Sequence, residues 1–135
     1  MLNLNRIDKD AVAQQLLNMW MNAEYPLDTR PREWWVTAFT RLGYSSDGRV
    51  GEKLRPADGL VLCRGAVESA RDGLSWTPNI ELARWFAERC GGELWVCWFP
   101  PSALLARMGP QWGDVHIPGC SEFICDPAGL LIEEY

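Results

Sequence analysis

Three polar residues that adjoin apolar runs are the strongest candidates for chemistry in this sequence. Arg64 ends one apolar run, Ser75 lies in a second, and Glu122 opens a third, 58 positions after Arg64. Arginine offers several N–H donors to an anion, and a carboxylate can stabilise positive charge that develops during a reaction. If the three runs are strands, these side chains can meet in one cleft.

Short apolar runs bounded by turn residues predict a set of strands in the second half of the chain. A buried strand over 60–63 stops at Arg64-Gly65, so we expect Arg64 at the end of that strand. Leu94 to Phe99 is the most strand-like segment, and Pro100-Pro101 ends it. Further strands are predicted at 74–77, 122–125 and 130–132.

Apolar residues at three- and four-residue spacing predict three helices. The first is capped by Asp8 or Asp10 and runs to about residue 22, with an apolar face of Val12, Leu16, Met19 and Trp20. The second starts after Thr29, ends at Gly43 and buries Trp34, Trp35, Ala38, Phe39 and Leu42. The third opens at Thr77-Pro78 and has a shared face of Ile80, Ala83, Phe86 and Ala87.

The remaining segments predict loops and one short helix. Residues 44–59 are polar and rich in glycine, which is typical of a long loop. Ser102 can cap a short helix over 103–108. Residues 109–121 contain Trp112 and His116 in a long irregular segment, and such loops often carry function.

Together these elements predict an α+β fold with an antiparallel or mixed sheet. We expect one domain over 1–135, with a helical lobe at 1–45 and a β core at 60–135. The net charge of −5 and the presence of only two lysines argue against duplex nucleic acid as the main partner. The 11 arginines still allow a local site for one dinucleotide, because arginine is the better phosphate ligand.

Cysteine usage and hydropathy predict a cytoplasmic protein. Five cysteines without a CxxC pair, together with a single histidine, support neither a disulfide framework nor a zinc site, so no metal is expected. The first ten residues are too polar for a signal peptide, and no apolar run approaches the roughly 18 residues of a membrane span. No membrane partner is expected.

Three motifs, in this order, resemble the Arg–Ser–Glu branch of the ADP-ribosyltransferases. They are Cys63-Arg64-Gly65, then Leu74-Ser75-Trp76-Thr77 running into Ile80-Glu81-Leu82-Ala83-Arg84-Trp85-Phe86-Ala87, and later Ser121-Glu122-Phe123-Ile124. In that family an Arg-Gly ends the first core strand, a Ser-x-Ser/Thr strand precedes a helix with an Ala-x-x-Phe-Ala pattern, and a glutamate opens a late strand. The resemblance covers about residues 60–127. It implies an ADP-ribosyltransferase-like split mixed or antiparallel β-sheet core with an N-terminal helical lobe.

The resemblance implies that NAD⁺ is the substrate and that its nicotinamide–ribose bond is cleaved. Such cleavage passes through an oxocarbenium-like sugar that a carboxylate stabilises, and Glu122 would supply this carboxylate. Arg64 would hold the phosphates of NAD⁺ or the adjoining ribose. Gly65 would let the cofactor approach the backbone.

The same resemblance assigns the Ser-x-Thr segment to cofactor binding. Ser75 would position Glu122 and the nicotinamide ribose, and Thr77 would take the family's second hydroxyl position. A plain helix cap is an equally good interpretation of Thr77. For Trp76 and Trp85, a place in the nicotinamide wall and a place in the core both remain open.

One departure from the family bears on the acceptor. Members that modify arginine carry a second glutamate two residues before the catalytic one, and Cys120 stands there in this chain. Transfer to arginine is therefore not expected. Trp112 and Cys120 would belong to the acceptor-reading loop. The acceptor, macromolecule or small molecule, stays open, and transfer to water would give NAD⁺ glycohydrolase activity.

Two other classes of function fit parts of the sequence. A non-catalytic module could retain the fold to bind a nucleotide or a protein. A Cys–His hydrolase could be built on Cys120 or Cys125 with His116 as the base.

Overall fold

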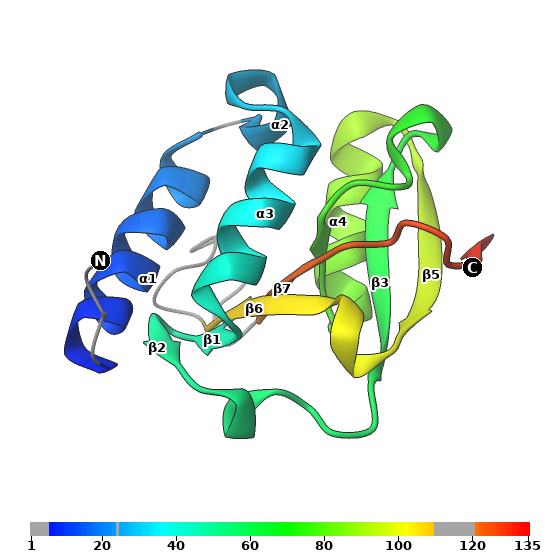
Figure 1. Ribbon diagram of the computed structural model, residues 1–135. Coiled ribbons are helices and arrows are strands. Elements are labelled where there is room, and N and C mark those ends of the chain that lie inside the picture. The colour runs from blue at the N-terminus through cyan, green and yellow to red at the C-terminus, as the bar shows by residue number, and fades with distance from the viewer. Residues whose placement is uncertain (1–5, 24, 110–120) are drawn as a thin grey trace.

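The computed structural model describes residues 6–23, 25–109 and 121–135 (Figure 1). Its helices are α1 (Arg6–Asn22), α2 (Pro26–Thr29), α3 (Arg32–Leu42) and α4 (Ile80–Cys90). Its strands are β1 (Ser45–Ser46), β2 (Arg49–Val50), β3 (Leu60–Ala66), β4 (Ser75–Trp76), β5 (Glu93–Phe99), β6 (Leu104–Met108), β7 (Glu122–Cys125) and β8 (Ile132–Glu134). Short 3₁₀ turns lie at Glu52–Leu54, Glu68–Ala70 and Pro101–Ala103. The α+β class predicted from the sequence is confirmed.

The described strands form two sheets. One has five strands in the order β2-β1-β6-β7-β4, and the other has three in the order β3-β5-β8. All strand pairs are antiparallel except β1 with β6, so the first sheet is mixed and the second is antiparallel. This arrangement agrees with the antiparallel or mixed sheet that the sequence predicts.

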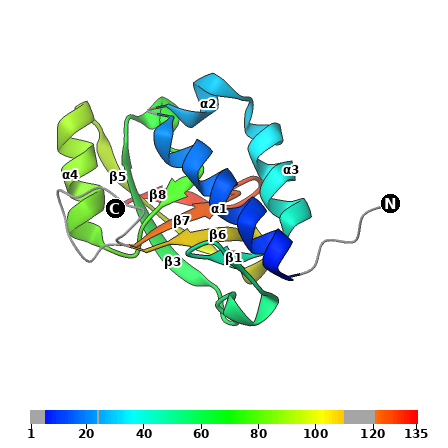
Figure 2. The same ribbon diagram turned by 90° about the vertical axis from the view of Figure 1, so that its left-hand side faces the viewer.

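Alternation of side chains along β7 builds a core on each side of the five-stranded sheet. Ile124 packs with residues of α1 and α3, whereas Phe123 and Cys125 pack with residues of the three-stranded sheet. Figures 1 and 2 show α1 and α3 on one side of the molecule and α4 on the other, beside β3 and β5. Each of the two sheets therefore joins strands that lie far apart in the sequence.

The N-terminal helices follow the apolar spacing, with local corrections. Trp35 and Phe39 are buried in α3, which ends at Gly43 as predicted, with a φ of 96° that favours glycine. Trp34 is 38% exposed, not buried, and the guanidinium of Arg30 lies over its ring. Val12 on α1 is likewise exposed. The apolar stripe is therefore narrower than the sequence pattern suggests.

The cap predicted for α1 is wrong. The helix begins at Arg6, so Asp8 lies in its first turn. Asp10 instead accepts a hydrogen bond of 2.8 Å from the backbone N–H of Val50, which ties α1 to β2. None of the described helices has both the length and the hydropathy that a membrane-spanning helix requires.

Two segments predicted as a loop and as a helix contain strands instead. The strands of the first are very short, and the strand of the second is covered by other residues on both faces. Residues 44–59 hold the β1–β2 hairpin, whose turn residues Asp47 and Gly48 have φ of 53° and 77°. Two-residue strands leave no alternation to detect, although Asp-Gly is a hairpin signal. The predicted helix over 103–108 is the strand β6, which is apolar on consecutive positions because both of its faces are covered.

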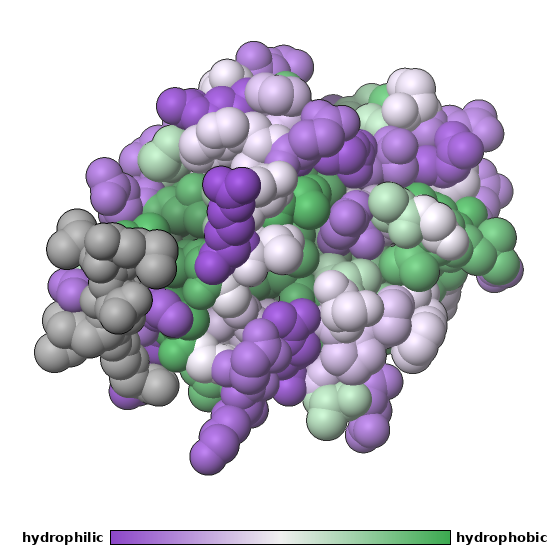
Figure 3. Space-filling model, in the orientation of Figure 1, coloured by the Kyte–Doolittle hydropathy of each residue, from purple (hydrophilic) through white to green (hydrophobic). Residues whose placement is uncertain are grey.

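Part of the three-stranded sheet exposes apolar side chains. Val61 of β3 lies opposite Trp98 of β5, and they are 61% and 54% exposed. Figure 3 shows hydrophobic surface at the right-hand edge of the molecule, where the C-terminal end of the chain lies in Figure 1. Neither Val61 nor Trp98 lines the cleft described below.

Candidate functional site

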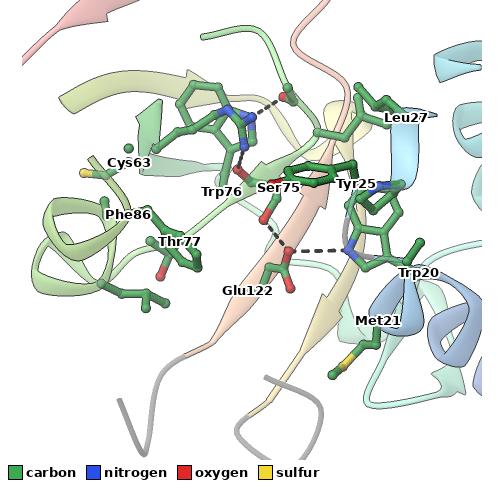
Figure 4. A pocket seen from close by; sticks show the side chains of 18 of the residues that line it. Trp20, Met21, Tyr25, Leu27, Cys63, Ser75, Trp76, Thr77, Phe86 and Glu122 are labelled. Carbon is green, nitrogen blue, oxygen red and sulfur yellow. Dashed lines mark hydrogen bonds between the residues drawn. The ribbon is translucent and has the colours of Figure 1, made fainter. Parts of the chain in front are cut away.

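A cleft of about 630 Å³ brings the three predicted site residues together. Arg64, Ser75 and Glu122 all line it (Figure 4). Its walls come from the end of α1 and the segment to α2, from β3, β4 and α4, and from the start of β7. The lining side chains include Trp20, Tyr25, Arg64, Ser75, Phe86 and Glu122. The size is typical of a small-molecule site.

Glu122 lies at the start of β7 and points to the helical side of the sheet. It shares that face with Ile124, two residues on, which packs against α1 and α3. Its Oε1 accepts hydrogen bonds from the Ser75 hydroxyl and from the Trp20 indole N–H, the latter at 3.4 Å. Among the described residues no hydrogen bond reaches Oε2.

The electrostatics of Glu122 are set mainly by its surroundings. Burial raises the pKa of this carboxyl above its ordinary value. Hydrogen bonds from Ser75 and Trp20 and the positive charge of Arg64 lower the pKa, but they offset the effect of burial only in part. The site therefore holds a carboxyl whose protonation changes at a higher pH than that of an exposed glutamate.

Ser75 reaches the cleft because of the register between β4 and β7. Ser75 pairs with Ile124 and Trp76 pairs with Phe123 in this antiparallel ladder. Ser75 therefore faces the helices together with Glu122, and Trp76 faces the opposite core. The contact between the Ser75 hydroxyl and Glu122 joins two residues that lie 47 positions apart.

Arg64 lies within β3, not at its end, because the strand continues to Ala66. Its Nε donates to the carbonyl of Ala70 at 3.0 Å, and one Nη donates to the carbonyl of Ser75 at 2.9 Å. Arg64 therefore anchors the chain that leads into β4. Arginine has five N–H donors, so those not used by the two carbonyls remain for a ligand.

Arg64 is also the source of positive charge in the cleft. Among the described lining residues it is the only basic side chain. Burial lowers the pKa of the guanidinium from its ordinary value, and the nearby Glu122 and Asp72 raise it. Because arginine stays protonated in proteins, this wall of the cleft attracts an anion.

Two glycines fit the backbone closely around Arg64. A Cβ at Gly65 would collide with the carbonyl of Ala83 and the amide of Ala87, both in the backbone of α4. A Cβ at Gly73 would collide with the Arg64 guanidinium. Gly65 lines the cleft, but the lack of a side chain there is required by the packing of β3 against α4.

The two tryptophans of the motif have different surroundings, and Trp76 is among the residues that line the cleft. Trp76 is 1% exposed, donates its indole N–H to the carbonyl of Gly73 at 2.8 Å and contacts the Phe99 ring edge-on. It belongs to the core between the sheets. Trp85 does not line the cleft, and its ring contacts Phe86 and the Arg89 guanidinium.

Thr77 connects β4 to the segment that precedes Glu122. Its hydroxyl donates to the carbonyl of Ser121 at 2.8 Å and accepts from the amide of Asn79 at 3.1 Å. The cap of α4 is Asn79, whose side chain accepts from the amides of Glu81 and Leu82. The interpretation of Thr77 as the helix cap is therefore wrong.

Trp20 and Arg107 contribute to the site without having been predicted for it. Trp20 of α1 reaches Glu122 of β7, a contact that no local sequence pattern indicates. Arg107 forms an ion pair of 3.0 Å with Asp47 and donates to the Ser121 hydroxyl at 3.0 Å. These bonds fix the residue that precedes Glu122.

The residues of the Cys–His alternative are only partly described. Cys120, His116 and Trp112 lie outside the described residues. Cys125 is fully buried, and burial raises the pKa of its thiol well above the ordinary value, which makes it a poor nucleophile. Among the described residues no group of three or more His, Cys, Asp or Glu side chains could hold a metal ion.

Comparisons with models of protein families, with curated proteins and with solved structures find no match to this chain. The chemistry of the cleft is therefore inferred from its own side chains. Arg64 offers donors to an anion, Ser75 and Glu122 offer polar partners to sugar hydroxyls, and Tyr25 and Phe86 offer apolar walls to planar rings. A phosphorylated nucleoside combines all three groups.

Proposed function

We propose that this protein is an ADP-ribosyltransferase that binds NAD⁺ in the cleft and cleaves its nicotinamide–ribose bond. The observation that carries the proposal is that Glu122, bonded to Ser75, shares one cleft with Arg64, the only basic side chain among its described lining residues. The same three residues carry the sequence resemblance.

The proposed role of Glu122 follows from the reaction. As the bond to nicotinamide breaks, positive charge develops on the ribose, and an ionised carboxylate next to it stabilises the transition state more than the ground state. The Oε2 atom lacks a described hydrogen-bond partner and is the oxygen that would meet the ribose. Ser75 would keep Oε1 in place.

The proposed role of Arg64 is to hold the diphosphate. Its two carbonyl bonds fix the guanidinium, so the remaining N–H groups are oriented before the ligand arrives. The acceptor of the ADP-ribosyl group stays open, and water is one candidate. Because Cys120 replaces the family's second glutamate, arginine is not the proposed acceptor.

A nucleotide-binding module without catalysis is the second candidate. The observation that favours it is the burial of Glu122, because a raised pKa reduces the fraction of carboxylate that is ionised at a given pH. Such a module would bind NAD⁺ without releasing nicotinamide.

The experiment that tests the proposal is nicotinamide release from NAD⁺ by the purified protein, with and without cell lysate. We expect Glu122→Gln to lower the rate by about 10²- to 10³-fold, as loss of one electrostatic group from a preorganised site does. Glu133→Gln, the same change at an exposed residue of β8, should leave the rate unchanged.

Each outcome separates the candidates. An unchanged rate in folded Glu122→Gln protein would remove Glu122 from the mechanism. Binding of NAD⁺ with no release in either condition would support the binding module. No binding at all would contradict both proposals.

A further inference from the structure

The indole of Trp20 contacts Glu122, although the proposed reaction assigns Trp20 no role. Trp20 lies on α1 and is 6% exposed, yet its Nε1 lies 3.4 Å from Oε1 of Glu122, which is 102 positions away in sequence. Figure 4 shows the indole nitrogen directed at the carboxylate, on the opposite side from Ser75. A buried indole N–H needs a partner, and here the partner is the candidate catalytic carboxylate.

Aromatic packing holds this indole in place. The Trp20 ring contacts Trp35 edge-on with a centroid distance of 5.0 Å, and it contacts Phe39 at 6.3 Å. The second of these rings is itself stacked on Trp35. Three rings from α1 and α3 therefore fix the direction of one N–H bond.

We propose that Trp20 is a positioning residue for Glu122, through which the N-terminal helices orient the carboxylate. Its N–H and the Ser75 hydroxyl both donate to Oε1, so two donors from different elements hold this oxygen in place. The inference deepens the proposed function and rests on it for the catalytic consequence. The contact itself is independent of any activity.

The sign of the electrostatic effect follows from the donor. An N–H that points at a carboxylate stabilises the ionised form, so Trp20 lowers the pKa of Glu122. From the other elements, Ser75 of β4 and the positive Arg64 of β3 act in the same direction. Asp28 of α2 lines the cleft, and the thiol of Cys125 is the titratable neighbour on β7.

The hydrogen bond from Trp20 to Glu122 is long enough to shorten when a ligand binds. A separation of 3.4 Å is long for an N–H to oxygen hydrogen bond, and catalytic hydrogen bonds often shorten when the ligand binds. Positive charge on a ribose next to Oε2 would hold Glu122 in its ionised form. The indole N–H would then bind a full carboxylate.

The test uses a matched pair of substitutions. Trp20→Phe keeps a ring in the cluster and removes the N–H that reaches Glu122. Trp35→Phe makes the same change in the same cluster, but the N–H it removes reaches the carbonyl of Pro26 at 2.9 Å. Only the first change removes a hydrogen-bond donor from the carboxylate.

The primary readout is titration of the Glu122 side chain in the unliganded protein by carboxyl ¹³C NMR, with Glu122→Gln to assign the signal. We expect the pKa to be higher in Trp20→Phe than in the wild type, and to change less in Trp35→Phe, which keeps the N–H that reaches Glu122. An unchanged pKa in folded Trp20→Phe protein would overturn the proposal. This readout does not depend on turnover.

A second measurement covers the case in which Trp20→Phe does not fold. In the wild-type protein the ¹H–¹⁵N signal of the Trp20 indole should shift with the titration of Glu122, and this step should be absent in Glu122→Gln. An indole signal that does not follow the carboxyl would overturn the proposal.

The catalytic consequence is tested separately. If nicotinamide release is observed, Trp20→Phe should lower kcat about tenfold with little change in KM, and the pH midpoint of kcat should move upward. A change in KM with kcat unchanged would contradict a positioning role. If no release is observed while the NMR results hold, the proposed function fails and the contact between the helices and Glu122 stands.

Discussion

At the scale of single residues, Glu122 is placed where its function would conflict with stability. Burial raises its pKa, so the ionised form that a reaction would need is the form that the folded protein disfavours. Below the ordinary glutamate range near 4.3 the group is protonated in both folded and unfolded chains. Above that range the unfolded chain ionises first, so stability falls as the pH rises through the raised pKa.

We therefore expect Glu122→Gln to stabilise the protein at neutral pH, by on the order of 1 kcal/mol, as is common when a functional site loses an unfavourable group. The amide keeps the volume of the side chain and an oxygen for Ser75. Urea unfolding at several pH values measures the effect. The gain should widen as the pH rises above the glutamate range and close again toward acid pH. A difference that does not vary with pH would contradict the assigned cause.

At the scale of elements, sequence predicts structure well where a single segment contains the whole signal. Helix α3 has a proline before its first residue and a glycine after its last, and β5 has an uninterrupted apolar run ended by prolines. The helix predicted in place of β6 is wrong because a strand covered on both faces shows no alternation. The identity of β6 depends on partners elsewhere in the chain.

The residues of the site likewise divide into those that the sequence predicts and those that it does not. The sequence predicts Arg64, Ser75 and Glu122 because each adjoins an apolar run that predicts a strand. The structure brings all three into one cleft. No local pattern predicts a role for Trp20 in the site, because its partner Glu122 is 102 positions away. For Gly65 the resemblance implies a role in cofactor approach, whereas its closest neighbours are backbone atoms of α4.

The two interpretations of Gly65 predict different results for Gly65→Ala. If the glycine only allows a cofactor to approach, the variant keeps its stability and loses affinity. The geometry instead predicts overpacking between β3 and α4, which lowers the free energy of unfolding by about 1–3 kcal/mol before any ligand is added.

Chemical denaturation of the unliganded protein distinguishes these two outcomes. Gly91→Ala is the control, because Gly91 has a φ of 68° and no atom lies within 4 Å of the place that a Cβ would take there. That variant therefore reports backbone strain without a clash. Wild-type stability in Gly65→Ala would show that the close approach of the helix is not required.

At the scale of the whole molecule, the cleft lies where two cores meet. One core joins the N-terminal helices to the five-stranded sheet, and the other joins the two sheets. Glu122 and Ser75 face the first, while Arg64 comes from the three-stranded sheet of the second. A ligand that contacts both Glu122 and Arg64 would therefore bind both halves of the fold, and its binding energy would add to the stability of the whole.

Arg64 is the residue at which structural and ligand-binding roles can be separated. Arg64→Ala removes two charge-assisted bonds to the carbonyls of Ala70 and Ser75, so we expect the unliganded protein to lose about 2 kcal/mol of stability. If Arg64 also holds phosphate, the gain in stability on adding NAD⁺ at 100 times the wild-type Kd, about 2.7 kcal/mol for the wild type, should largely disappear. Denaturation with and without NAD⁺ measures both terms. Arg84→Ala, on the exposed face of α4, should change neither. A variant that loses stability but keeps the full gain from NAD⁺ would restrict Arg64 to its structural role and place the phosphates elsewhere.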